Sequence, residues 1–248
     1  MEIEFFYFLV FVLATLQAII GVGVLVLGTP LLLIFNYDII EIMALLLPIS
    51  IVTSLLNYLF LRYNKKKFKI NLDKNIKKTI FGFLLPGMGI GLILTKNYFH
   101  HIRFDILVSL IIFLSLAIKL KFQNTINALS PTLKRAALFL IGIVHGITNS
   151  GGALLVIFFS SLVRNKKNQS RFELTFYYLF LALVQYLIFL TIFKKELFLD
   201  YPFEILLIVI PSLFAGNRIT KSISEKFFKR ILELLVLFAG IFLILNNW

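Results

Sequence analysis

The chain has no cysteine and few acidic residues. Among its 248 residues are 12 Asp or Glu and 25 Lys or Arg, which give a formal net charge of +13. The missing cysteines exclude disulfides, thiolate catalysis and sulfur-ligated metals. The basic residues lie in short loops between apolar segments, so they predict membrane topology rather than nucleic-acid binding. We expect lipid headgroups and soluble anions as partners, and no nucleic acid or cofactor.

The chain is rich in apolar side chains. Hydrophobic residues make up 60% of it and 28 residues are Phe, more than a water-soluble domain could bury. We therefore expect an all-α polytopic membrane protein. Eight hydrophobic segments can be read from the sequence: Phe5–Phe35, Ile39–Leu61, Thr79–Thr95, Phe104–Leu120, Ala136–Val163, Phe172–Phe193, Pro202–Ile219 and Ile231–Asn247.

Two of these segments, Phe5–Phe35 and Ala136–Val163, are too long for one crossing. A continuous Phe5–Phe35 helix would span roughly 46 Å, against a hydrocarbon core of about 30 Å. Glycines interrupt each segment near its middle, at 21–23 and at 151–152. Broken segments at matching positions of two halves are typical of transporter binding sites. Close helix packing is the alternative role for the glycines, but it does not explain the excess length.

The basic residues predict that the broken segments return to the side they entered. If all eight segments crossed once, Lys and Arg would divide almost evenly between the two sides, against the positive-inside tendency. With two hairpins, the loops 62–78, 119–135, 164–171 and 218–230 all become cytoplasmic. Only four of the 25 basic residues remain outside. The charge count requires only that the second broken segment be a hairpin. The prediction of a hairpin in the first broken segment depends on its length, its glycines and the symmetry between the two halves.

A weak internal repeat supports two halves, residues 1–123 and 124–248. Corresponding loops of the halves carry opposite charge bias, which predicts inverted repeats, each with three crossings and one hairpin. Both termini would then lie outside. The aligned pairs are Gln17 with His145, Gly21 with Asn149, Gly23 with Gly151 and Asn57 with Gln185.

The hairpin tips are the predicted binding site for a small anion. Helix N-termini offer N–H donors to anions without a buried lysine, and the arm after each break begins such a helix. Asn57 and Gln185 have helix packing as an equally open role, and His145 is either a packing residue or a proton relay. The candidate residues are Gln17, Gly21, Gly23, Thr29, Asn57, His145, Thr148, Asn149, Ser150, Gly151, Gly152 and Gln185.

Four motifs stand out in the two halves: the stretch Gln17–Pro30, the Asn149–Gly152 cluster, and the Pro86–Gly91 and Pro211–Gly216 segments. Together they resemble the sulfite exporter TauE/SafE family of membrane permeases. The resemblance covers essentially the whole chain and implies a permease, not an enzyme, that moves sulfite, a sulfonate or a related small anion across a bacterial cytoplasmic membrane. Val24 and Leu25 stand where the family has glycines, which leaves the substrate open.

Two other functions compete with the permease. A membrane hydrolase would use Ser150 and His145, but nucleophilic catalysis needs a third, orienting group, and the aligned first break has neither residue. An anion channel would use the same re-entrant elements, and saturable flux would distinguish a carrier from it. The loop pair His100–His101 has no nearby carboxylate or cysteine, so we expect it to be solvated rather than a metal site.

Overall fold

The computed structural model describes residues 3–64, 74–162, 167–193 and 203–224, with a few single residues between 227 and 245. Within these ranges every element is helical, so the all-α prediction is confirmed there. The predicted eighth segment, Ile231–Asn247, lies almost entirely outside the described residues.

Four helices of the described ranges are long and apolar enough to cross a membrane, and they correspond to four predicted segments. They are Ile39–Tyr63, Lys77–Tyr98, Asn168–Ile192 and Phe203–Ser222. Glu4–Ile20, Val24–Ile34 and Phe104–Ile118 are shorter apolar helices. The chain is therefore a multi-pass membrane protein, as the composition predicts.

These four spans are built from the following elements. They are α3 (Ile39–Tyr63), α5 (Lys74–Thr79) continued by the π-helix η1 (Ile80–Leu84) and α6 (Leu85–Tyr98), α10 (Lys167–Ile192), and the 3-10 helix η4 (Phe203–Ile208) continued by α11 (Val209–Ser222). Local signals fix the start of α3, where the Glu41 carboxylate accepts a hydrogen bond from the Asp38 amide at 3.1 Å, as in a capping box.

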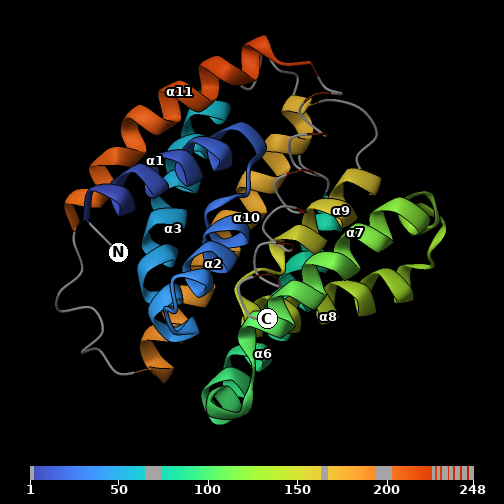
Figure 1. The fold of residues 1–248 in the computed structure, drawn as a ribbon. Helices are drawn as coiled ribbons and strands as arrows, with labels where there is room; N and C mark the ends of the chain where they lie inside the picture. The colour runs from blue at the N-terminus through green and yellow to red at the C-terminus, as the bar shows by residue number, and fades with distance from the viewer. Residues whose placement is uncertain are drawn as a thin grey trace.

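Both predicted breaks are present (Figure 1). The first segment forms α1 (Ile3–Ile20) and α2 (Val24–Ile34), and the second forms α8 (Pro131–Thr148) and α9 (Gly152–Leu162). The first segment folds back on itself, because the rings of Phe5 and Phe35 lie 5.5 Å apart. In one straight helix they would be about 45 Å apart.

Each broken segment packs closely against a helix from the other half of the chain. Helix α8 packs on α6, and α1 packs on α11. Glycines allow this approach: a Cβ on Gly142 would lie 2.9 Å from the Met88 amide, and one on Gly216 would lie 2.8 Å from the Thr15 carbonyl. Helices α3 and α10, which also come from different halves of the chain, pack on each other.

Two of the three glycines of α6 serve helix packing. A Cβ on Gly87 or Gly91 would clash with the backbone of α8. Gly89 has ordinary clearance instead, 3.6 Å from the Ile188 side chain.

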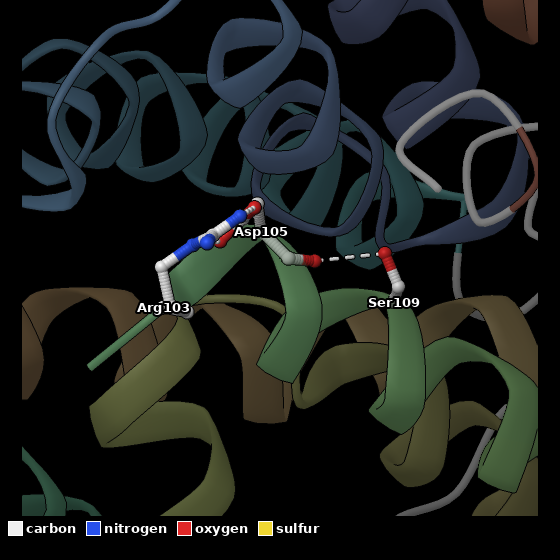
Figure 2. A network of polar contacts seen from close by, with 3 residues as sticks. All are labelled: Arg103, Asp105 and Ser109. Carbon is white, nitrogen blue, oxygen red and sulfur yellow. Dashed lines mark hydrogen bonds and ion pairs between the residues drawn. The ribbon is translucent and has the colours of Figure 1, made fainter. Parts of the chain in front are cut away.

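Helix α7 (Phe104–Ala128) is longer than the predicted segment and begins at a charged pair. The Arg103 Nη2 atom lies 2.6 Å from Asp105 Oδ2, and Ser109 Oγ donates to the Asp105 carbonyl oxygen at 2.8 Å (Figure 2). The hydrogen bond to Asp105 raises the pKa of Arg103. An acidic residue in the first turn of a helix also interacts favourably with the helix dipole.

The close packing of α6 and α8 makes a stability prediction. Gly142→Ala should destabilise the protein by about 1–3 kcal/mol, because a methyl group there overpacks a backbone contact. Gly82→Ala is the matched control, since a Cβ on Gly82 meets nothing within 4 Å. Thermal unfolding in detergent measures both. Equal unfolding temperatures for the two variants would contradict the packing account.

Candidate functional site

The two breaks share one backbone plan, and it relates the same residues that align in the sequence. The end of α1 is closed by Gly21 N donating to Gln17 O at 2.7 Å, and the end of α8 by Asn149 N donating to His145 O at 2.8 Å. A Cβ on Gly23 would lie 2.8 Å from Gln17 N, and one on Gly151 would lie 2.8 Å from His145 N. The chain therefore turns in the same way at both tips.

Each break needs a residue that tolerates left-handed backbone. Gly21 has φ +100 and Asn149 has φ 58. Glycine and asparagine are the residues that adopt this region most readily. Gly21 is also confined sterically, because a Cβ there would lie 2.8 Å from the Arg171 carbonyl oxygen. The left-handed backbone therefore explains why glycine stands at position 21 and asparagine at position 149.

In the first break, the Gln17 side chain caps the start of α2. Its Oε1 accepts a hydrogen bond from Val24 N at 2.9 Å. Its Nε2 donates to the Ser50 carbonyl oxygen at 2.9 Å and to Ser54 Oγ at 2.8 Å, both on α3. One buried side-chain amide thus caps the first helical N–H group of α2 and links three helices.

The end of α1 is satisfied by Asn57, which also holds a buried cation. Asn57 Nδ2 donates to Ala18 O at 3.4 Å and to Thr175 Oγ1 at 3.2 Å. Its Oδ1 accepts from Arg171 Nη2 at 2.7 Å, and the same nitrogen donates to Asn217 Oδ1 at 2.8 Å. A positive charge near a helix C-terminus is favourable, so this network stabilises the end of α1.

Arg171 corrects one sequence-based interpretation. The topology count placed it in a cytoplasmic loop, but α10 begins at Lys167 and Arg171 is only 2% exposed inside the fold. Two amide oxygens, from Asn57 and Asn217, replace the water that a loop arginine would have. Without Arg171, 20 of the other 24 basic residues are still predicted on the cytoplasmic side.

The second break is joined to the first hairpin and to α10 through Asn149. Its Nδ2 donates to Thr29 Oγ1 on α2 at 3.1 Å, and its Oδ1 accepts from Gln185 Nε2 on α10 at 3.1 Å. Thr148 turns its hydroxyl inward along the backbone, donating to Val144 O at 2.7 Å and accepting from Ser150 N at 3.3 Å. The second break therefore lies against the middle of α2 and against α10.

Around this second break several buried polar atoms have no hydrogen-bond partner among the described residues. They are both ring nitrogens of His145, Ser150 Oγ, Tyr178 Oη and Gln185 Oε1. All four side chains are 0% exposed. The imidazole lies beside the Gln185 side chain without hydrogen-bond geometry. Because native proteins rarely leave buried polar groups unpaired, these atoms indicate a ligand or water site.

Tyr178 reaches the start of α9. A Cβ on Gly152 would lie 2.7 Å from Tyr178 Oη, so the hydroxyl rests against the first residue of that helix. The Tyr178 and His145 rings are 5.9 Å apart. Val26 of α2 lies on the same spot, 2.6 Å from the same Cβ position, and forms an apolar wall.

The predicted site residues form two groups in space. Gln17, Gly21, Gly23 and Asn57 surround the first break, and Thr29 joins the second group, which is His145, Thr148, Asn149, Ser150, Gly151, Gly152 and Gln185. Sequence reasoning missed Arg171, Thr175 and Tyr178. With Gln185 they follow a spacing of four, three and seven along α10, which places them on one helix face. That spacing was the available signal.

The Gln17 cap predicts a structural phenotype. Gln17→Leu keeps the side-chain size but leaves the Val24 amide and two α3 acceptors without their partner, so we expect a loss of about 2–4 kcal/mol of stability. Ser54→Ala removes a single acceptor and should lose about 1 kcal/mol or less. Thermal unfolding in detergent compares them, and a harmless Gln17→Leu would refute the capping role.

The chain was compared with known proteins. No curated protein and no solved structure matches it. The family model described as sulfite exporter TauE/SafE matches residues 6–243, nearly the whole sequence. This match agrees with the motifs at both breaks and with the multi-pass helical fold. The chain belongs to the sulfite exporter TauE/SafE family.

Proposed function

We propose that this protein is a permease of the bacterial cytoplasmic membrane that moves a small sulfur-containing anion, such as sulfite or an organosulfonate. The anion is held between the tips of the two broken helices. Family membership supports the anion class. The observation that carries the site is the group of buried donors without a hydrogen-bond partner around the second break, one of which, Tyr178 Oη, lies against the start of α9 beside Val26 of α2.

The chain is organised as two inverted repeats, residues 1–123 and 124–248, with each first segment re-entrant. Three observations support this arrangement. The two breaks have matching backbone hydrogen bonds, the first segment folds back so that Phe5 meets Phe35, and each broken segment packs on a helix of the other half. A binding site at the repeat interface is the usual consequence of such an architecture.

A carrier explains the site better than a channel or a hydrolase. The donors at the second break are fully buried, which corresponds to an occluded state that a carrier must pass through and an open pore does not need. Ser150 and His145 are not hydrogen-bonded to each other, although a nucleophile and its base must be within hydrogen-bond reach.

Transport is tested by anion flux. Cells or proteoliposomes with the protein should take up or release sulfite, sulfoacetate, taurine or thiosulfate faster than those without it, and the flux should saturate. Linear flux without saturation would favour a channel. No increase for any sulfur anion would contradict the proposed substrate class.

The tip site is tested by a charge placed at the second break. Asn149→Asp should lower flux at least about tenfold, because a carboxylate repels the anion while keeping the acceptor for Gln185. Asn36→Asp is the matched control, because Asn36 also has positive φ, at 61, but is exposed at the end of α2. Retained flux in Asn149→Asp would exclude the tip site.

Topology is tested by single cysteines, which need no background removal because the chain has none. Cysteines replacing Lys78 and Lys221 should be shielded from an impermeant thiol reagent in intact cells, whereas one replacing Lys96 should react. All three side chains are exposed. Labelling of only one of Lys78→Cys and Lys221→Cys would contradict the inverted arrangement.

A further inference from the structure

The two breaks share a backbone plan but differ in how their polar groups are satisfied. In the first break, Gln17 Oε1 accepts a hydrogen bond from Val24 N at the start of α2. At the aligned positions of the second break stand His145 and Gly152, and neither ring nitrogen of His145 has a hydrogen-bond partner among the described residues. The first helical amide of α2 therefore has a side-chain cap, and the aligned amide of α9 has none among the described residues.

The second tip consequently presents free donors at a helix N-terminus. Ala153 N donates to Ser150 O at 3.3 Å, and Leu155 N donates to Gly151 O at 3.1 Å. The amides of Gly151 and Gly152 have no acceptor among the described residues. Helix α9 has 11 residues, long enough for its dipole to favour an anion at this end.

Three side chains add donors at the same place. Tyr178 Oη lies against Gly152, Ser150 Oγ stands at the break itself, and His145 lies 5.9 Å from Tyr178 between ring centroids. All three are fully buried and unpartnered. A hydroxyl or a neutral imidazole can each donate one hydrogen bond. Leaving such groups unpaired costs about 1–3 kcal/mol each, so an occupant that accepts hydrogen bonds is expected.

The charge at this tip fits one negative charge rather than two. A helix N-terminus supplies about half a positive charge, and the side-chain donors here are neutral. The buried guanidinium of the described ranges, Arg171, donates to Asn57 and Asn217 instead, beside the first break. A second negative charge would be left without compensation in a desolvated site.

From these observations we infer that the two breaks have different roles. The first is a closed structural joint, and the second binds one monovalent oxyanion at the N-terminus of α9 through Tyr178, Ser150 and His145. The substrate class is thus a sulfonate or hydrogen sulfite rather than a divalent sulfate or sulfite. This inference rests on the proposed function and narrows it.

The experiment measures anion binding to the purified full-length protein by titration calorimetry. The probes are methanesulfonate, which is monovalent, and sulfate, which is divalent and of similar size. Wild type should bind methanesulfonate at least about a hundredfold more tightly than sulfate, because only the first charge is compensated. Comparable affinities would overturn the monovalent assignment.

Variants then test the individual donors. Tyr178→Phe and Ser150→Ala should each weaken methanesulfonate binding about tenfold or more. Tyr177→Phe is the matched control, because it removes another buried tyrosine hydroxyl one residue away, and it should change affinity by less than about threefold. Size exclusion and thermal unfolding verify that each variant folds.

The outcomes separate this inference from the proposed function. If wild type transports sulfonate but Tyr178→Phe and Ser150→Ala match the Tyr177→Phe control, the α9 site is wrong while the transport function stands, and the orphaned donors hold water. If wild type moves no sulfur anion but binds nitrate or acetate in a Tyr178-dependent manner, the site stands and the sulfur class is wrong. Absence of any monovalent-anion binding overturns the site itself.

Discussion

A helix that stops inside a hydrocarbon layer exposes backbone N–H and C=O groups that lipid cannot satisfy. The same need for partners applies at the two interrupted helices, whose breaks are buried inside the protein. At the first break, Gln17 and Asn57 supply the missing partners from side chains, and they tie α1, α2, α3 and α10 together in doing so. The surrounding packing of glycine against backbone holds the broken arms in place.

The second break meets the same constraint differently. Asn149 connects it to Thr29 of α2 and to Gln185 of α10. Tyr178 Oη, which has no hydrogen-bond partner among the described residues, lies against the start of α9. Helix α10 contributes to both tips, with Arg171 and Thr175 at the first and Tyr178 and Gln185 at the second. A shift of α10 would therefore alter both tips together.

The sequence alone predicts the all-helical membrane fold, both breaks and their aligned residues, because segment length, glycine positions and the distribution of basic residues can be taken directly from a sequence. It also predicts Asn149 and Gln185 as site residues. It does not reveal that the Gln17 side chain caps α2 and is therefore already hydrogen-bonded, since that depends on the distance from Gln17 to Val24 and α3. Arg171 was assigned to a loop because an arginine that follows other basic residues is typical of a loop between membrane segments. Tyr178 was missed because an aromatic residue within an apolar segment is typical of helix packing.

The central claim is that the anion lies at the second break and not at the first. Crystals of the protein soaked at neutral pH in hydrogen selenite, a monovalent and heavier analogue of hydrogen sulfite, would locate the anion through the anomalous scattering of selenium. The account predicts a selenium peak at the N-terminus of α9, with its oxygens within hydrogen-bond distance of Ser150 Oγ and Tyr178 Oη. A peak beside Arg171 at the first break, with the second tip empty, would contradict it.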